Sequence, residues 1–499
     1  MKFISTRGLG ATDKSQAMDS AEAIIRGLAP DGGLYVPEEL PRVPADFAAQ
    51  LAELDYARRA RRVLSLFLTD YTEEEIAGCI DRAYSGKFDD GRIAPVKQVG
   101  DKSVLELWHG PTSAFKDMAL QLLPQLLSTA LKKTGEKNRV LILVATSGDT
   151  GKAALAGFAD VDQTKICVFY PDGGVSDIQR LQMATQKGEN VAVLAIKGNF
   201  DDAQTGVKKI FGDEAAAKEL AETGVQLSSA NSINWGRLVP QIVYYFSAYA
   251  DLIAAGRIKA GDTVDFTVPT GNFGNILAGF YARQMGLPVG KLVCASNANN
   301  VLTDFIQTGY YDRRREFFKT ISPSMDILVS SNLERLLYHL TGDPARVAAW
   351  MKELNETGGY DAGENMLARL ANYFWAGWVD DAKTLETIKA VYEEYGYVLD
   401  THTAVAWAVA EAYRSKTRSD RPMVIVSTAS PYKFSSSVLE ALGEKAAGKD
   451  AFAQLEALEE KNPVKAPVGL AGLKGLPVLH KTVVEKADMM KAVKEFAGK

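Results

Sequence analysis

The sequence predicts an α/β protein with open, largely parallel sheets flanked by helices. A chain of 499 residues is too long for one compact core, so two or three lobes are expected. From Ser103 onward, short runs rich in Val, Ile and Leu alternate with longer segments of helical pattern, which is typical of parallel sheets with helical crossovers. The candidate strands include residues 103–108, 139–146, 165–170, 190–197, 263–269, 291–296 and 422–428.

Both ends of the chain have a different, helical pattern. Residues 1–95 are mostly helical with a turn-rich break at 29–44, and the Ala-, Lys- and Glu-rich tail is broken at 462–477. We therefore expect an N-terminal helical domain over 1–95 and an accessory helical segment over 437–499. Between them we expect one α/β lobe over 96–258 and a second over 259–436.

Composition excludes several classes of protein. The net charge of −5, without a long basic run, argues against a general nucleic-acid partner. The cysteines Cys79, Cys167 and Cys294 are far apart, which predicts neither a disulfide framework nor a metal site. No secretory signal is recognisable and no apolar run reaches the roughly 20 residues that span a bilayer, so no membrane partner is expected. The sequence thus predicts a cytoplasmic protein.

The first candidate site is the turn "HGPTSAF", which ends at Lys116. In open α/β sheets ligands bind beyond the carboxyl ends of the strands, and this turn follows the run 103–108. Lys116 begins a predicted helix that closes near residues 132–133, with a kink expected at Pro124. The helix dipole disfavours a cation in the first turn, a penalty that a deprotonated or imine-linked lysine would not carry in full. The alternative is a solvated residue at a helix start.

The second candidate is the turn "TSGDTG" after the run 139–146. A nucleotide P-loop would need Gly where Thr146 stands and Ser or Thr where Ala153 stands, so a nucleotide hydrolase is disfavoured. The backbone and hydroxyl groups of this turn could hold a carboxylate or phosphate, or they could simply cap the helix. Its residues are Ser147, Gly148, Asp149, Thr150 and Gly151.

Two further turns follow predicted strands. The loop "GNFGN" carries two glycines that allow close approach to a ligand and successive N–H groups that suit an anion. It lacks the GxGxxG pattern and an acidic ribose partner, so a dinucleotide is not expected. The run 422–428 ends in hydroxyls at Ser427, Thr428 and Ser430, which alone indicate no more than caps.

Together these motifs resemble the fold-type II enzymes that use pyridoxal phosphate, the tryptophan synthase β group. Within that group the chain resembles the threonine synthases of the longer bacterial and fungal class. The segments "FISTRG", "GLAPDGGLYVPEELP", "NSINWGRLVPQ" and "LDTHTAVA" carry this likeness, which runs from Phe3 to Phe434. The chain departs from the family pattern at Ser430, where His is usual, and at Thr401, where Pro is usual, and these departures bear on substrate tuning.

The resemblance implies two tryptophan synthase β-like lobes and a role for each motif. Lys116 would form the Schiff base with pyridoxal 5'-phosphate, and Thr428 would bond its pyridine nitrogen. The segment from Ser147 to Gly151 would lie near the carboxylate of the substrate. The cofactor phosphate would be cradled by Gly271, Asn272, Phe273, Gly274 and Asn275.

The implied reaction turns O-phospho-L-homoserine and water into L-threonine and phosphate, with Lys116 removing the α-proton. A second phosphate then needs cations, for which Arg7, Arg180, Arg237 and Lys433 are candidates, Arg237 being assigned to the substrate. A monomer or weak homodimer is expected. The alternative is another phospholyase or β-replacement enzyme of this fold; a catalytically silent relative is disfavoured because it would not need Lys116.

Other residues are predicted to be structural. Phe115 is expected to pack beside Lys116, and His109 to brace its turn rather than act as acid or base. His402 is expected at a helix start. His339 and His480 have no neighbouring residues in the sequence that indicate a chemical role.

Overall fold

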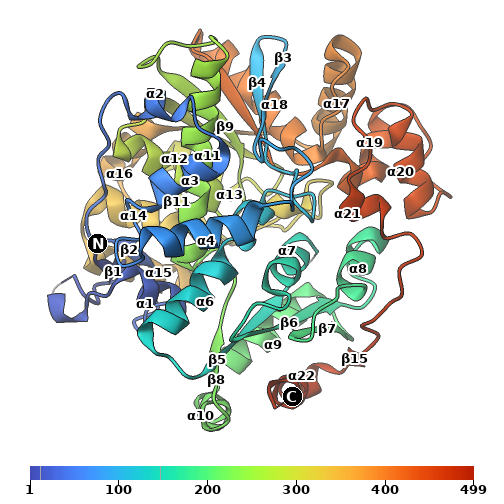
Figure 1. The fold of residues 1–499 in the computed structure, drawn as a ribbon. Coiled ribbons are helices and arrows are strands. Elements are labelled where there is room, and N and C mark those ends of the chain that lie inside the picture. The colour runs from blue at the N-terminus through green and yellow to red at the C-terminus, as the bar shows by residue number, and fades with distance from the viewer. Residues whose placement is uncertain (12, 147, 499) are drawn as a thin grey trace.

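Two sheets of parallel strands, each covered by helices, carry the four turns (Figure 1). The computed structural model describes residues 1–11, 13–146 and 148–498. The larger sheet has six strands in the order β13 (Phe374–Trp378), β10 (Val289–Ser296), β9 (Val264–Pro269), β14 (Met423–Ser427), β4 (Lys102–Glu106) and β3 (Val96–Val99). Only β3 is antiparallel, because a tight hairpin turn through Gly100, at φ 58°, joins it to β4.

The smaller sheet is parallel throughout. Its order is β15 (Val483–Val484), β7 (Val191–Ile196), β6 (Thr164–Pro171), β5 (Arg139–Ala145) and β8 (Val225–Ser228). Its helices are α7 (Asp149–Phe158), α8 (Asp177–Ala184), α9 (Phe200–Phe211) and α10 (Glu214–Glu222). All seven candidate strands are confirmed, and the α/β class with largely parallel sheets is confirmed with them.

The chain crosses between the two sheets more often than the predicted division into lobes implies. Strand β4 pairs with β14 of the larger sheet, although the predicted division placed residues 96–258 in the lobe of the smaller one. The division at residues 95, 258 and 436 stays a prediction. The crossing matters for the site because it brings the turn after β4 against the end of β14.

The N-terminal region is mainly helical, as predicted. It contains α1 (Ser20–Arg26), α2 (Phe47–Leu51), α3 (Tyr56–Leu64), α4 (Glu73–Tyr84) and a short antiparallel pair of β1 (Phe3–Ser5) with β2 (Tyr35–Pro37). The buried Arg59 of α3 bonds Asp251 at 2.5 Å, which ties this region to the central helix α11 (Trp235–Ala254).

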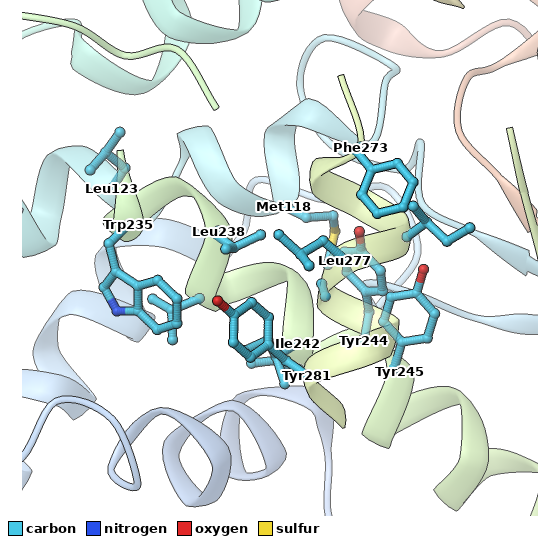
Figure 2. Close-up of a cluster of buried hydrophobic side chains, with 14 of the residues drawn as sticks. Met118, Leu123, Trp235, Leu238, Ile242, Tyr244, Tyr245, Phe273, Leu277 and Tyr281 are labelled. Atoms are coloured by element: carbon cyan, nitrogen blue, oxygen red, sulfur yellow. The ribbon is translucent and has the colours of Figure 1, made fainter. Parts of the chain in front are cut away.

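Helix α11 is almost wholly buried at the centre of the molecule. Figure 2 shows its Trp235, Leu238, Ile242, Tyr244 and Tyr245 packed with Leu277 and Tyr281 of α12 (Gly274–Met285) and with Met118. Each of these side chains is buried at 0% exposure. Burial of this many large apolar side chains fixes the relative positions of α12 and of the helix that begins at Lys116.

The helix that begins at Lys116 is broken at the proline, as predicted. Helix α5 (Lys116–Leu120) ends and α6 (Leu123–Thr134) begins with Pro124 in its first turn. The proline ring cannot accommodate a straight helix at the carbonyl four residues earlier. A Cβ on Gly157 of α7 would fall 1.8 Å from that Leu120 carbonyl oxygen, so the glycine lets α7 pack against the break.

The remaining helices between β10 and residue 441 pack on the larger sheet or on one another. They are α13 (Val301–Thr308), α14 (Leu333–Thr341), α15 (Pro344–Thr357), α16 (Glu364–Tyr373), α17 (Asp381–Tyr395), α18 (Thr401–Thr417) and α19 (Ser435–Ala441). A small antiparallel pair, β11 (Tyr310–Asp312) with β12 (Gly359–Asp361), lies among them. Short 3₁₀ turns occur at Lys14–Gln16, Pro323–Met325, Pro431–Phe434 and Lys486–Asp488.

The C-terminal segment contains one strand that the sequence did not predict. Helices α20 (Ala451–Glu459), α21 (Val468–Ala471) and α22 (Met489–Ala497) match the expected helical character. Between the last two, β15 joins the edge of the smaller sheet parallel to β7, so the red end of the chain in Figure 1 reaches from one sheet to the other. Among the described residues no helix has the length and hydropathy of a membrane span.

Candidate functional site

The turn before Lys116 is bound to the end of β14. The Phe115 N–H donates to the Thr428 carbonyl at 2.8 Å, and the Ser430 N–H donates to the Ser113 carbonyl at 3.1 Å. Ala114 and Ala429 form a β-bridge between these two bonds. Two motifs more than 300 positions apart are thereby joined, and Lys116 lies at the carboxyl end of the central strand, where ligands of such sheets bind.

The Lys116 amine is buried between two polar partners and one ring. Its Nζ lies 3.9 Å from Asp149 Oδ2, donates to Ser324 Oγ at 3.4 Å and lies 5.0 Å from the centre of the Phe115 ring. The packing predicted for Phe115 is confirmed. Burial lowers the pKa of Lys116 to about 8, the nearby Asp149 carboxylate opposes that fall, and Arg237 and Lys433 add to it.

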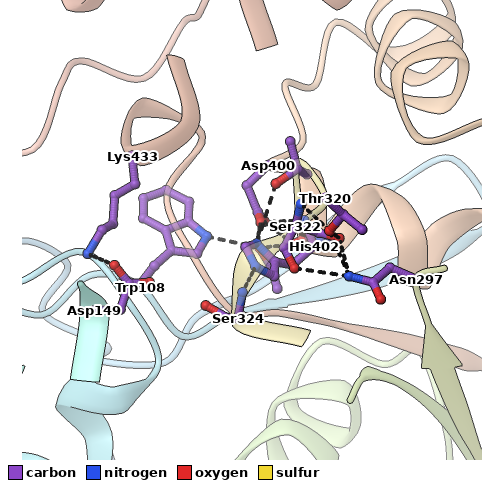
Figure 3. A network of polar contacts seen from close by, with 12 residues as sticks. Trp108, Asp149, Asn297, Thr320, Ser322, Ser324, Asp400, His402 and Lys433 are labelled. Carbon is purple, nitrogen blue, oxygen red and sulfur yellow. Dashed lines mark hydrogen bonds and ion pairs between the residues drawn. The ribbon is translucent and has the colours of Figure 1, made fainter. Parts of the chain in front are cut away.

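Asp149 is held by a second lysine. Its Oδ1 accepts a hydrogen bond from Lys433 Nζ at 2.7 Å (Figure 3). The same oxygen accepts a second bond from Gln179 Nε2 at 3.1 Å. Burial alone would raise the pKa of Asp149, but Lys433 and Lys116 hold it well below its usual range. Gly148 has φ 141°, and a Cβ there would fall 2.4 Å from the Gln179 amide, so glycine is required at this turn.

The first residue of the "TSGDTG" turn, Thr146, caps the N–H groups that follow it. The Thr146 hydroxyl accepts from the N–H groups of Gly148 at 3.0 Å and Gly151 at 2.9 Å. The N–H groups of Gly148 and Gly151, which the sequence analysis considered for anion binding, are therefore already bonded. Their bonds support the alternative that they cap the helix. Thr150 is half-buried, and Ser147 lies outside the described residues.

The "GNFGN" loop leads into α12 through a left-handed residue. Phe273 has φ 63° and is buried against Phe374, with ring centres 5.6 Å apart. The loop is fixed from behind, because Ser330 Oγ donates to the Gly271 carbonyl at 2.8 Å and Asn332 donates twice to the Asn272 carbonyl at 3.1 Å.

The side-chain oxygen of Asn275 is bonded to two core tyrosines. Its Oδ1 accepts from the hydroxyls of Tyr244 at 2.7 Å and Tyr245 at 2.9 Å, both in the core beneath. Asn275 can contribute to an anion site at the loop through its backbone N–H in the first turn of α12, but not through its side-chain oxygen.

A segment that the sequence did not predict completes the site. Residues 320–332, called the cover segment below, contact both Lys116 and the glycine loop. A Cβ on Gly271 would fall 2.8 Å from the Ser324 carbonyl oxygen, which shows how closely the two backbones approach. The short strand β11 lies before this segment but was not among the predicted strands, so the search of turns after strands could not find it. The segment is rich in Ser, which alone does not indicate a site.

Polar residues at the start of α18 and directly after β10 hold the cover segment (Figure 3). His402 Nε2 accepts from the Ser324 N–H at 3.1 Å, while its Nδ1 lies 3.1 Å from Asp400 Oδ1. Asn297 Nδ2 donates to Thr320 Oγ1 at 2.8 Å and to Ser322 Oγ at 3.0 Å. His402 does lie at the start of a helix, α18, as predicted, and it also anchors the site.

The four basic candidates differ sharply in their partners. Arg7 forms two 2.9 Å bonds with Glu334, Arg180 lies 3.6 Å from Asp177, and Lys433 is held by Asp149. Arg237 is buried, its Nη1 donates to the Ala230 carbonyl at 2.8 Å, and among the described residues it pairs with no carboxylate. Burial lowers its pKa to about 10. A buried cation without an acidic partner is the arrangement expected of an anion site.

Two remaining positions have structural surroundings. His109 lies 2.5 Å from Asp89 and 2.9 Å from Glu106, which braces its turn. At the departures from the family pattern, Thr401 is buried as the first residue of α18, and the buried Ser430 hydroxyl has no partner within the described ranges.

Comparison with known proteins covers nearly the whole chain. Three family descriptions match in order: "Threonine synthase N terminus" over residues 2–84, "Pyridoxal-phosphate dependent enzyme" over 103–373 and "Threonine synthase, C-terminal" over 403–496. The threonine synthase of Pseudomonas aeruginosa is 42% identical, over 88% of this chain and 90% of its own. Human threonine synthase-like 1 is 40% identical over 97% of this chain, which spans 65% of that protein's length.

Solved structures agree with this assignment. A threonine synthase from Brucella melitensis with bound pyridoxal phosphate has a TM-score of 0.87 and 38% identity, covering 100% of this chain and 99% of its own. The yeast threonine synthase also has a TM-score of 0.87, at 34% identity over 99% of this chain and 98% of its own. The chain therefore belongs to the threonine synthase family of pyridoxal-phosphate dependent enzymes.

Proposed function

We propose that the protein is a threonine synthase, which converts O-phospho-L-homoserine and water to L-threonine and phosphate. The observation that carries the proposal is the buried Lys116 amine, whose pKa burial lowers to about 8, placed where β14, α7 and the cover segment meet. A lysine with a lowered pKa is suited both to bind an aldehyde and to exchange protons near neutral pH.

The residues present fit pyridoxal 5'-phosphate. Lys116 would hold its aldehyde carbon, and Thr428, tied by its carbonyl to the turn of Lys116, would face the ring nitrogen with its hydroxyl. Bound there, the cofactor supplies an electron sink for carbanion chemistry. Its phosphate would bind the N–H groups at the start of α12, contributed by Gly271, Asn272, Phe273, Gly274 and Asn275.

The substrate brings a second phosphate, and Arg237 would bind it. The guanidinium suits phosphate through its fork of donors, and it lacks a competing carboxylate among the described residues. Asp149, by contrast, is an unsuitable partner for an anion because it is itself negative. We therefore assign the substrate contacts of its turn to Thr150 and the neighbouring Ser147, because the N–H groups of Gly148 and Gly151 are bonded to the Thr146 hydroxyl.

Lys116 would perform the proton transfers. Its Nζ would remove the α-proton and then a β-proton of the substrate, so that the γ-phosphate can leave. As the ammonium it would return protons to the γ- and α-carbons while water adds at the β-carbon. Ser324 Oγ, 3.4 Å away, orients the amine during these steps.

A product assay tests the function. The full chain with pyridoxal 5'-phosphate and O-phospho-L-homoserine should release phosphate and L-threonine in equal amounts, and Lys116→Ala should release neither. Phosphate accompanied by 2-oxobutyrate alone would identify another phospholyase of this fold and overturn the proposal.

We also place the reaction in the cytoplasm, in a monomer or weak homodimer, with no nucleic-acid or membrane partner. A reducing compartment is supported by the cysteines Cys79, Cys167 and Cys294, which are free and buried. Sedimentation of the purified chain over a range of concentrations tests the oligomeric state.

A further inference from the structure

Two buried lysines share one carboxylate at the centre of the site. Lys433 Nζ lies 2.7 Å from Asp149 Oδ1, while Lys116 Nζ lies 3.9 Å from Asp149 Oδ2. The side chain of Lys433 is 0% exposed and that of Asp149 is 6% exposed. Lys433 also donates to the Thr112 carbonyl at 2.9 Å, in the turn that carries Lys116.

The sharing is unequal. Oδ1 of Asp149 receives both Lys433 and Gln179, which fixes the carboxylate from the side away from Lys116. The other oxygen stays at the outer limit of an ion pair with Lys116. A carboxylate at hydrogen-bonding distance would instead favour the ammonium form of Lys116, because an opposite charge stabilises the charged state.

We infer that Lys433 is a positioning residue, which holds Asp149 back from Lys116 and so leaves the Lys116 amine free to exchange protons. The chemical use of that amine rests on the proposed function, but the arrangement of charges does not. Lys433 is thus assigned to Asp149 and not to the phosphate of the substrate.

The other charged groups around Lys116 do not hold Asp149 back in the way that Lys433 does. Arg237 opposes the ammonium form as Lys433 does, but it contacts neither Asp149 oxygen among the described bonds. Asp117 favours the ammonium form, yet its carboxylate is occupied by the Thr112 N–H at 2.8 Å and the Thr112 hydroxyl at 2.7 Å. His402 reaches Lys116 only through Ser324. Among the residues that the structure describes, Lys433 is therefore the one cation that both faces Lys116 and holds its counter-ion.

The test measures the titration of Lys116 by ¹³C NMR in the full chain with labelled lysine, the resonance being assigned through Lys116→Arg. In Lys433→Met the titration midpoint should rise by about 1 unit or more, since Asp149 can close onto Lys116. Lys433→Arg keeps the cation and should leave the midpoint near that of the unchanged chain. Lys152→Met, which removes a lysine of α7 whose burial also lowers its pKa, is the matched control and should not raise the midpoint.

A double-mutant cycle separates positioning from simple repulsion. If Lys433 acts through Asp149, Lys433→Met should raise the midpoint much less in an Asp149→Asn chain than in the unchanged chain. An equal rise in both backgrounds, or no rise in either, overturns the inference. Should Lys433→Met not fold, Lys433→Gln keeps a donor for the Thr112 carbonyl and is used in the same cycle.

The readout needs neither cofactor nor substrate. A chain that forms no threonine but shows the predicted midpoints would contradict the proposed function alone, and an active chain without the shift would contradict the inference alone.

Discussion

The Nε2 atom of His402 accepts a hydrogen bond from the backbone N–H of Ser324 at 3.1 Å. This bond joins α18 to the cover segment, whose next contact is the Lys116 amine. Because Nε2 faces a donor, it must be unprotonated, and the ring proton lies on Nδ1 towards Asp400. One histidine thus fixes a segment that touches both Lys116 and the glycine loop.

Removing this acceptor should lower activity without unfolding the protein. His402→Asn keeps a donor near Asp400 but leaves the Ser324 N–H unbonded, which costs about 1–3 kcal/mol and predicts roughly a tenfold or greater fall in kcat/KM. Steady-state kinetics check this, with His480→Asn as the control because the His480 ring bonds the Gln186 carbonyl and, among the described bonds, does not reach the cover segment. An unchanged kcat/KM in His402→Asn would show that the cover segment holds its position without the histidine.

The glycine loop should tolerate no side chain at its first residue. In Gly271→Ala the new Cβ would fall 2.8 Å from the Ser324 carbonyl oxygen, so the loop or the cover segment must shift. We expect the dissociation constant for pyridoxal 5'-phosphate to rise at least about tenfold, measured by fluorescence titration. Gly212→Ala, where the nearest atom is 3.5 Å away, should bind the cofactor normally. Equal affinity in both variants would contradict the cradle.

His109 should make stability depend on alkaline pH. Burial opposes its charge, but hydrogen bonds to Asp89 and Glu106 raise its pKa to about 9 from 6.5. The contribution of the charged His109 to the free energy of unfolding is therefore fully present below about pH 6.5 and is lost as the pH rises through 9. Its size is on the order of 2–3 kcal/mol. Denaturant unfolding at pH 6.5 and 9.5 should show that loss in the unchanged chain but not in His109→Gln. A loss of equal size in both would place its origin elsewhere.

Arg237 should affect substrate binding more than folding. Arg237→Met removes charged hydrogen bonds worth about 1.5–3 kcal/mol, which predicts a 10- to 100-fold rise in the KM for O-phospho-L-homoserine. Arg346→Met, on the outer helix α15, is the control. If Arg180→Met raises KM instead, the substrate phosphate lies at α8 and the assignment of Arg237 is wrong.

The sequence predicted those parts of the site that follow strands. Apolar runs identified seven strands, and the turns after four of them contain Lys116, Gly148, Gly271 and Thr428, because sheet geometry places such turns at one edge. The kink at Pro124 was also predictable, since it follows from the chemistry of proline alone.

Other parts of the site depend on contacts between distant segments, which local pattern does not contain. Ser324 lies in a segment that follows none of the predicted strands, and its role arises from packing against Gly271 and His402. The choice between Lys433 and Arg237 as the anion binder depends on their partners. Lys433 is paired with Asp149, whereas Arg237 pairs with no carboxylate among the described residues. Strand β15 has only two residues and forms through its pairing with β7.

Reductive trapping tests the central claim most directly. Borohydride treatment of the full chain with pyridoxal 5'-phosphate, followed by peptide mass spectrometry, should place the reduced cofactor on the peptide that contains Lys116, at one per chain. The natural competitor is Lys152, whose pKa burial also lowers to about 8. Cofactor found on Lys152, or spread over surface lysines with Lys116 unmodified, would contradict the account of the site given above.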